Sequence, residues 1–189
     1  MSNFKLLSLL LLLCIALTTG CAGSRGSIKA MGDVQPAVED KLASYKYLSL
    51  QTSCAPGVQV PSEAIKRIEE LVVTNVAKPG APRMLSAAEP DQDASLLLTC
   101  QMVFERFEEG NAFARAMIAG AGQMHITASV SLLDTNTRNQ LAQFKVDKTF
   151  AWGGIYGASQ KITDLEPGFA QAVADAITGR KEEKPKSKE

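Results

Sequence analysis

The sequence predicts an α+β domain, a two-layer sandwich in which a four-stranded, mainly antiparallel sheet carries two helices on one face. Four segments are enriched in β-branched and aromatic residues, or alternate between apolar and polar residues, and these indicate strands. Two further segments repeat apolar residues at helical spacing. Their order along the chain is β-α-β-β-β-α, without a long internal repeat. Residues 43–179 hold all six segments, which is the length of one ordinary domain.

The first strand and the first helix occupy the start of this domain. Residues 45–52 are rich in Tyr, Leu and Thr and predict a strand, which Pro56-Gly57 ends. A helix follows, with Ser62 as the candidate N-cap. Its apolar face recurs at three- and four-residue spacing: Ile65, Ile68, Val72 and Val76. Pro79-Gly80 ends the helix, and residues 79–93 are expected to form an irregular surface connection.

The next two strands show which face of the sheet is packed. Residues 96–107 form the second strand, whose even positions share one apolar face: Leu96, Leu98, Cys100, Met102 and Phe104. Residues 123–134 form the third strand, with the most regular alternation in the chain. Ile126, Ala128, Val130 and Leu132 lie on one face, and His125, Thr127, Ser129 and Ser131 lie on the other. Such alternation is typical of a sheet with one packed and one solvated face.

The last strand and helix complete the domain. After a turn at residues 134–139, residues 140–152 pair back as the fourth strand, with these apolar positions: Ala142, Phe144, Val146, Phe150 and Trp152. Pro167 begins the last helix, where its missing N–H costs little, and Gly179 is the expected C-cap. The core-facing positions of this helix are Phe169, Val173 and Ile177. The charged residues 180–189 are expected to form a disordered tail.

Two glycine-rich segments are expected to meet at one end of the sheet. Residues 109–122 join the second and third strands, and residues 152–158 follow the fourth strand. These positions share one sheet edge in an up-down-up arrangement. If the first strand runs parallel to the second through a right-handed crossover, the loop at residues 54–61 arrives there too.

This convergence has two interpretations. The first is a partner-binding lip that presents apolar anchors beside two arginines: Arg106, Phe113, Arg115, Met117, Ile118, Trp152 and Tyr156. The second is local packing, in which residues 111–119 form a short helix that caps the sheet edge and the glycines serve bulges and turns. The segments do not form a phosphate-binding loop, because such a loop follows a strand and opens a helix.

The N-terminus has the features of a bacterial lipoprotein export signal. Lys5 precedes an apolar run at residues 6–17, and small residues at 18–20 lead to Cys21. A run of about a dozen residues is shorter than the about 20 that span a bilayer. We expect residues 1–20 to be removed and Cys21 to carry the lipid anchor. The alternative is an ordinary cleaved signal with a chance cysteine.

The residues after the signal are expected to connect the lipid to the domain. Residues 21–42 hold Gly, Ser, Asp and Gln with little periodicity, so they predict a flexible tether. Removal of the signal and acylation of Cys21 leave Cys54 and Cys100. In an oxidising compartment these two cysteines either form a disulfide or are small buried residues.

Composition and spacing exclude several kinds of chemistry. The 20 basic and 20 acidic residues balance, so the chain lacks the basic field that would attract nucleic acid. His125 is the only histidine, and no His/Cys/Asp cluster has the spacing of a zinc site. No nucleophile elbow or calcium-binding loop occurs. We therefore expect no metal, no cofactor beyond the lipid, and no enzymatic activity.

With these segments placed, the chain resembles a bacterial lipoprotein family of unknown function, the domain-of-unknown-function family 4410. The resemblance spans residues 45–177 and rests on three blocks: Arg106 to Gly122, Leu133-Asp134-Thr135-Asn136-Thr137, and Gly153-Gly154-Ile155-Tyr156-Gly157. The Asp-x-x-Thr turn is also similar to that of curli-secretion and TolB N-terminal-like α/β domains, although Arg138-Asn139 replaces the usual glycine. The family has no established catalytic residues. Resemblance to Gram-negative lipoproteins, with Ala22 after the cysteine, implies an outer-membrane location facing the periplasm.

These observations lead to one main functional hypothesis and one alternative. The main hypothesis is a non-enzymatic, lipid-anchored envelope module that binds a protein partner or forms a homo-oligomer. The alternative is a domain that binds a small anionic ligand or the cell wall through Arg106 and Arg115. A hydrolase is the least supported, because the sequence offers no set of residues for one.

Overall fold

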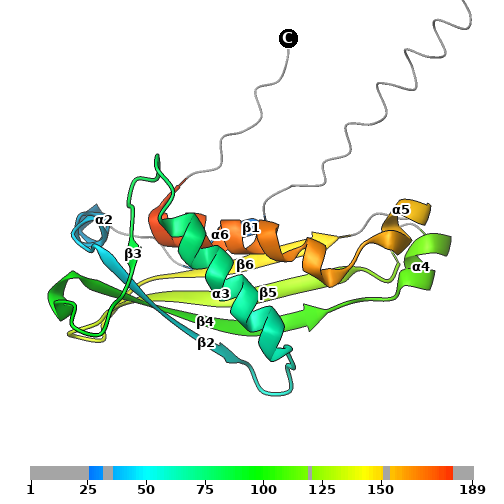
Figure 1. Cartoon of the computed structure of the whole chain (residues 1–189), viewed down its shortest axis with the longest axis horizontal. Coiled ribbons are helices and arrows are strands. Elements are labelled where there is room, and N and C mark those ends of the chain that lie inside the picture. Colours follow the sequence, from blue (N-terminus) through cyan, green and yellow to red (C-terminus); the bar gives the residue numbers. More distant parts are fainter. Residues whose placement is uncertain (1–25, 32–35, 119–120, 151–153, 181–189) are drawn as a thin grey trace, which may run out of the picture.

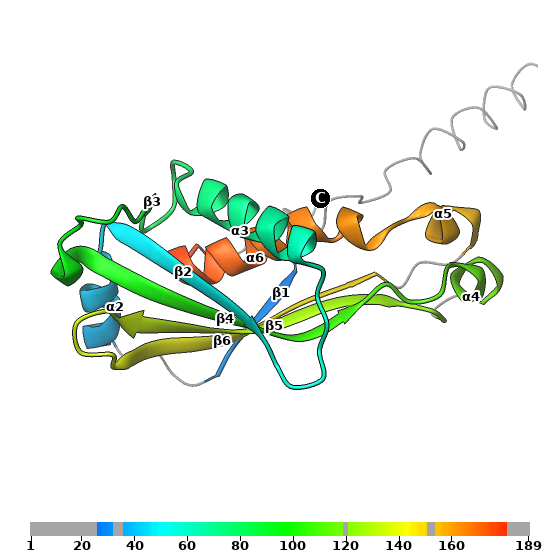
Figure 2. The same cartoon turned by 60° about the horizontal axis from the view of Figure 1, so that its bottom comes forward.

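The computed structural model describes residues 26–31, 36–118, 121–150 and 154–180. Helices cover one face of a twisted sheet, as Figures 1 and 2 show. The predicted signal peptide, the lipid site Cys21, Trp152 and residues 181–189 lie outside the described residues.

The sheet has six strands in the order β1-β6-β5-β4-β2-β3. Their bounds are β1 Ser27–Ala30, β2 Tyr47–Cys54, β3 Ser86–Ala87, β4 Leu97–Glu108, β5 Met124–Asp134 and β6 Gln140–Phe150. The four predicted strands correspond to β2, β4, β5 and β6, with bounds that differ by at most two residues. The prediction of a four-stranded sheet is wrong because a short strand is added at each edge.

Both additional strands lie where the sequence predicts irregular chain. β1 falls within the predicted tether and pairs antiparallel with β6, placing Ser27 opposite Asp147. β3 falls within the predicted surface connection and pairs parallel with the start of β2. Strands of four and two residues are too short to show a periodic pattern in the sequence. They form because the edges of β6 and β2 offer backbone groups with which they can pair. Helix α2 (Pro36–Ala43) also lies within the predicted tether, and the folded domain therefore begins before residue 43.

The central strands have the predicted directions. β2 and β4 are parallel and are joined by helix α3 (Ser62–Val76), whereas β4, β5 and β6 are antiparallel neighbours. A parallel pair requires a crossover connection, and α3 with its flanking loops supplies it. The end of β4, the start of β5 and the end of β6 therefore share one edge, as expected from the sequence.

The core lies between the sheet and two helices, α3 and α6 (Glu166–Thr178). The predicted inward positions of β4 and β5 are fully buried: Leu98, Cys100, Met102, Phe104, Ile126, Ala128, Val130 and Leu132. Phe104 stacks on Phe169 of α6 with ring centroids 5.9 Å apart. A bulge after Phe104 shifts the register of β4, so Phe107 returns to the packed face opposite Ile126.

The helix ends confirm one predicted cap and correct another. Gly179 ends α6 in the left-handed conformation with φ 71°, as predicted. Pro61, not Ser62, is the N-cap of α3, and no side chain caps that end. Arg67 of α3 makes a bidentate ion pair with the buried Glu166 at 2.8 and 2.9 Å, which joins the two helices.

Arg180, predicted as the first residue of the disordered tail, is held by the domain. Its backbone N–H donates to the Asp175 carbonyl, and its guanidinium lies 3.7 Å from the Asp175 carboxylate. Arg180 also donates to the carbonyls of Lys78 and Pro79 after α3. A guanidinium near a helix C-terminus is favoured by the helix dipole, so Arg180 belongs to the folded domain.

A cluster of charged and hydrogen-bonded side chains fixes the turn between β5 and β6. Asp134 accepts hydrogen bonds from the Tyr45 hydroxyl at 2.9 Å and the Thr137 backbone N–H at 2.9 Å, and pairs with Lys41 of α2 at 2.6 Å. The hydrogen bond from Lys41, followed by that from Thr137, lowers the pKa of the Asp134 carboxyl far below its usual value. Arg138 adopts the left-handed conformation with φ 58°, the role that a glycine usually takes in such a turn.

Candidate functional site

The two glycine-rich segments meet at one end of the molecule, as the sequence predicts. Each contains a short helix, α4 (Ala112–Met117) and α5 (Gly154–Ser159). Figures 1 and 2 show the two helices packed side by side beyond the end of the sheet. We call this end the lip, defined by α4, α5 and Ile118. The local-packing interpretation expected a short helix within residues 111–119, and the helix at residues 112–117 confirms that part of it.

Arg115 joins the two segments of the lip. Its guanidinium donates to the carbonyls of Gly122 at 2.8 Å, Gly157 at 2.9 Å, Glu109 at 3.0 Å and Gln160 at 3.2 Å. The side chain is 2% exposed. A guanidinium offers five N–H donors in a rigid fork, so one side chain satisfies carbonyls from four places in the chain. Arg115 is therefore part of the framework of the lip and does not present its charge to a partner.

Two glycines allow the segment before and after α4 to close tightly. Gly110 and Gly122 both adopt positive φ, at 65° and 63°. A Cβ atom on Gly110 would lie 2.2 Å from the carbonyl oxygens of Gly122 and Gln123, which no real side chain tolerates. Asn111 caps α4 by accepting a hydrogen bond from the Ala114 N–H at 2.9 Å. The short helix is thus held by backbone geometry as well as by Arg115.

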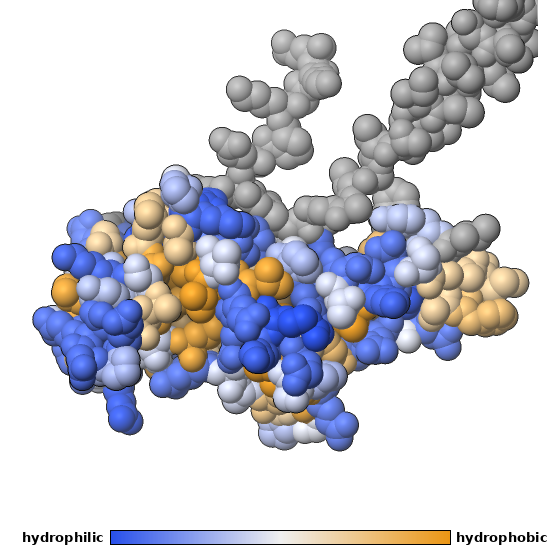
Figure 3. All heavy atoms as spheres, in the orientation of Figure 1, coloured by the Kyte–Doolittle hydropathy of each residue, from blue (hydrophilic) through white to orange (hydrophobic). Residues whose placement is uncertain are grey.

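The lip exposes its apolar side chains. Phe113 is 75% exposed, Met117 68%, Ile118 64% and Tyr156 46%. Tyr156 also contacts the ring of Phe150 at the end of β6, with centroids 6.2 Å apart. Figure 3 shows a hydrophobic area at the end of the molecule where α4 and α5 lie. Large apolar side chains gathered on a fixed surface are typical of an interaction site.

Arg106 does not belong to the lip, contrary to the prediction. It lies on β4 and pairs with Glu108 at 2.7 Å, with both side chains about half exposed. The bulge in β4 places Arg106 opposite Thr127 on the polar face of the sheet. With Arg106 paired there and Arg115 buried among carbonyls, the two arginines form no common anion-binding site.

A pocket of about 370 Å³ lies beside the lip, between the loop before α3 and the end of β4. Gln59, Val60, Pro61, Phe107 and Glu109 line it. The loop at residues 54–61 therefore reaches this end of the sheet, as the parallel crossover implies. Neither Arg106 nor Arg115 lines the pocket, and its charged residue is an acid, so it offers no positive charge for an anionic ligand.

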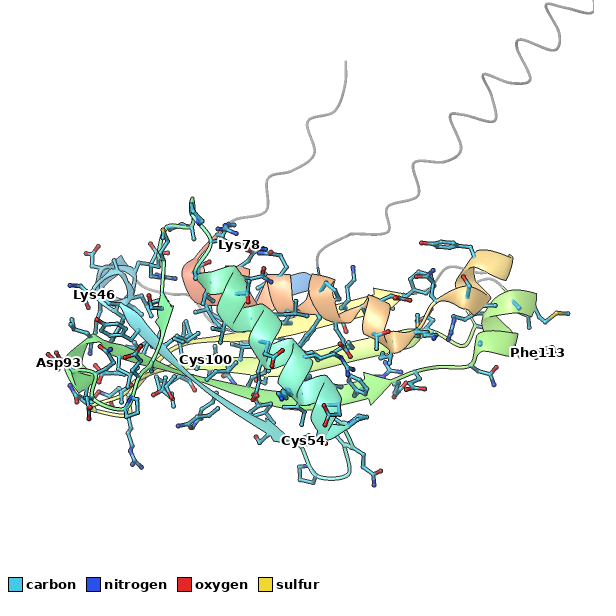
Figure 4. The ribbon with its side chains drawn as sticks, in the orientation of Figure 1. Lys46, Cys54, Lys78, Asp93, Cys100 and Phe113 are labelled. Atoms are coloured by element: carbon cyan, nitrogen blue, oxygen red, sulfur yellow. The ribbon has the colours of Figure 1, made fainter. Side chains whose placement is uncertain are left out.

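Of the two alternatives for Cys54 and Cys100, the disulfide is absent, because both thiols are free; Cys100 is buried, as the second alternative expects, whereas Cys54 is exposed. Cys100 lies opposite Leu50 on the neighbouring strand, four residues from Cys54, which separates the two by about 13 Å at strand spacing. Figure 4 shows Cys54 at the edge of the sheet and Cys100 in its middle. Burial raises the pKa of the Cys100 thiol to about 12, which makes it unreactive at neutral pH.

The polar face of the sheet carries a hydrogen-bonded network rather than a cleft. His125 Nδ1 lies 3.0 Å from the Thr149 hydroxyl, and Thr149 donates to Asp147 at 2.9 Å. Thr127 donates to the same carboxylate at 2.7 Å. Within the described residues, no three His, Cys, Asp or Glu side chains are placed to hold a metal ion. No helix among these residues has the length and apolar character needed to cross a bilayer.

Comparison with known families identifies the chain. The sequence model of the family described as domain of unknown function (DUF4410) matches residues 58–154, and the chain belongs to this family. The match covers the lip segment around α4 and ends as α5 begins. No curated protein matches the sequence.

Two solved structures are similar to the chain. The chain is similar to a PelC variant from Paraburkholderia phytofirmans that was solved as a dodecamer, with 13% identity and a TM-score of 0.50. This match covers 82% of this chain and 99% of that chain. A Xanthomonas campestris protein of the family DUF330 matches at 19% identity and a TM-score of 0.42, covering 72% of this chain and 81% of that one. At 13% identity, the likeness to the PelC structure shows the fold alone.

Proposed function

We propose that this member of the DUF4410 family is a lipid-anchored, non-enzymatic module of the cell envelope that assembles with further copies of itself through the lip. The observation that carries the proposal is the fixed apolar surface formed by Phe113, Met117, Ile118 and Tyr156. Its backbone is held by Arg115 and by glycines, while its largest side chains face solvent. A partner that covers these side chains would gain about 25 cal/mol per Å² of apolar surface removed from water.

A second copy of the chain is the partner that the fold comparison favours. The PelC structure that shares this fold is a dodecamer, so the fold is compatible with a ring or stack of identical subunits. Oligomers bury apolar surface that a monomer leaves exposed, and a lipid anchor on each copy would concentrate the subunits at one membrane. The proposal is therefore a homo-oligomer at the periplasmic face of the outer membrane.

The proposal of a non-enzymatic module is supported by the groups that the described residues offer. His125, Asp147 and Thr149 are hydrogen-bonded to one another on a polar sheet face and do not line the pocket beside the lip. The described thiol in the core, Cys100, is inaccessible, and Cys54 has no histidine among its hydrogen-bond partners. The proposal requires no cofactor beyond the lipid on Cys21.

A matched pair of substitutions tests the lip. Met117→Asp places a charge on the lip, and Met84→Asp makes the same change at a 56% exposed methionine elsewhere on the surface. The full chain, expressed in its membrane, would be treated with a lysine-reactive crosslinker and its products sized. We expect the crosslinked ladder to shorten for Met117→Asp and to remain for Met84→Asp. An unchanged ladder in both variants would refute assembly through the lip.

The lipid anchor is tested separately. Cys21→Ser removes the proposed acylation site and leaves the domain unchanged. We expect the variant to move from the membrane fraction to the soluble periplasmic fraction, and to lose incorporation of radiolabelled palmitate. Membrane retention without palmitate would show that another segment anchors the chain.

A further inference from the structure

The outer edge of β2 is open over most of its length. β3 covers β2 only at Tyr47 and Leu48, the two residues with which it pairs. Figures 1 and 2 show β2 running along the margin of the sheet beyond β3. β4 pairs with β2 on its inner side, and among the described residues no strand pairs with the outer side of β2 from Ser49 to Cys54. An open strand edge presents unpaired backbone groups that pair readily with another strand.

The printed hydrogen bonds fix which backbone groups face outward. The Leu48 carbonyl accepts from the Ala88 N–H at 2.9 Å on the β3 side. The Ala55 N–H donates to the Phe104 carbonyl at 2.9 Å on the β4 side. Because backbone groups alternate in direction along a strand, Leu50, Thr52 and Cys54 point their N–H and C=O groups outward.

The open edge lacks the protection that exposed strands normally carry. Residues 49–54 are Ser-Leu-Gln-Thr-Ser-Cys, with no charged residue and no proline. The opposite edge of the sheet differs, because β1 is four residues long and carries Lys29. Natural edge strands are commonly short, charged, bulged or covered, so an uncharged open edge of this length indicates a partner strand.

One side chain on this edge is also unsatisfied. The Thr52 hydroxyl is buried and makes no hydrogen bond to any described residue. A buried hydroxyl without a partner lowers the stability of the fold. Across an antiparallel pair of strands, threonines that lie directly opposite each other can hydrogen-bond.

We propose that two copies of this chain pair β2 with β2 in antiparallel orientation about a two-fold axis at Thr52. This register places Leu50 opposite Cys54 of the second copy, so the three outward-facing residues of each edge all find backbone partners. A strand that pairs with itself places similar side chains near each other, and the uncharged sequence of residues 49–54 avoids repulsion. A rotation of the Thr52 side chain would bring its buried hydroxyl to the Thr52 hydroxyl of the second copy, directly opposite across the axis. This interface is separate from the lip and does not depend on it.

A disulfide at the two-fold axis tests the register. Opposite Cα atoms in a hydrogen-bonded antiparallel pair lie about 5.5 Å apart, within the about 4.4–6.8 Å that a disulfide spans. Thr52→Cys combined with Cys54→Ser, in the full chain in its membrane, should form a linked dimer on mild oxidation. Thr149→Cys with Cys54→Ser is the control, because Thr149 is an exposed strand threonine on β6. A dimer band no stronger than that of the control would overturn the proposal.

Charge pairs test whether the contact is specific. In the proposed register residue 51 lies opposite residue 53 of the second copy, and both side chains are exposed. Gln51→Lys with Ser53→Lys should therefore abolish the dimer formed by the cysteine variant, and Gln51→Glu with Ser53→Glu should do the same. Co-expression of the lysine and glutamate variants should restore it. A dimer that persists in the lysine variant would contradict β2 pairing, whereas loss of the lip through Met117→Asp should leave this dimer intact.

Discussion

The two ends of the sheet use polar side chains in opposite ways. At the turn end, Asp134 collects Lys41, Tyr45 and Thr137, and these contacts hold α2 and the β5–β6 turn together. At the lip end, Arg115 serves only backbone carbonyls from the lip and its flanking residues. Both arrangements are buried, yet the lip gathers four of the six exposed large apolar side chains among the described residues, and the other two, Met31 and Met84, lie elsewhere.

This difference suggests that the turn end serves the stability of the fold, whereas the lip serves interaction with a partner. The turn end pairs its Asp134 carboxylate with Lys41 and with hydrogen-bond donors of the same chain. The lip also fixes its backbone through buried hydrogen bonds, but it leaves Phe113 and Met117 exposed, which marks it as an interaction site. A rigid apolar surface reduces the entropy lost on association, which is why the lip is the better candidate for an interface.

The largest effect is expected from Arg115→Ala. The change leaves four carbonyl groups without their buried donor, and hydrogen bonds to a charged group contribute about 1.5–3 kcal/mol each. We expect a loss of at least about 3 kcal/mol in chemical denaturation. Hydrogen exchange should rise first in residues 110–118 and 154–160. Arg115→Lys should restore only part of the loss, since a lysine cannot form the guanidinium fork.

Gly110→Ala should have the next largest effect, with Gly57→Ala as its matched control. Both glycines have positive φ, but a Cβ on Gly110 meets backbone atoms at 2.2 Å, whereas one on Gly57 meets nothing within 4 Å. Gly57→Ala should lose only the about 1–2 kcal/mol that a residue with a Cβ atom loses in the left-handed conformation. We expect Gly110→Ala to cost clearly more in thermal unfolding. Equal losses would mean that the tight closure beside α4 does not exist.

Asp134→Asn tests the turn end through pH. The pKa of the native Asp134 carboxyl is lowered from 3.8, mainly by Lys41, so its ion pair stabilises the fold above about pH 4. We expect the variant to be less stable than the native chain by about 1–2 kcal/mol at pH 7. That gap should narrow as pH falls below 4 and approaches the lowered native pKa. A gap that is constant from pH 7 to pH 2 would contradict the assignment.

The two cysteines allow a comparison of accessibility that needs no mutation and so leaves the stability of the fold unchanged. Cys54 is exposed, whereas Cys100 is buried with a pKa raised to about 12. A maleimide reagent should therefore label Cys54 in the native chain and label Cys100 only after unfolding. Rapid labelling of Cys100 in the folded chain would show that the centre of the sheet opens.

The central strands and both long helices are predictable because periodicity reports burial directly. Alternation along β5 and the three- and four-residue spacing along α3 each depend on residues within one element. β1 and β3 are not predictable in this way, since a short strand such as Ser27–Ala30 forms only because the edge of β6 is available. The same reason explains why part of the predicted tether is folded.

The sequence predicts where the candidate site lies, but it does not predict what each residue of the site does. The alternating strand directions bring the glycine-rich segments together, and exposed Phe113 and Met117 follow from the short helix. The inward turn of Arg115 does not follow, because its acceptors are backbone carbonyls, which have no sequence signal. Arg106 is misplaced because a bulge after Phe104 changes which face the strand presents.

The mass of the assembled protein tests the central claim most directly. The full chain, extracted in mild detergent, would be measured by light scattering beside Phe113→Asp with Met117→Asp, the two most exposed positions on the lip. The account predicts a large assembly for the native chain and a smaller, folded species for the variant. Identical masses for the two proteins would contradict assembly through the lip.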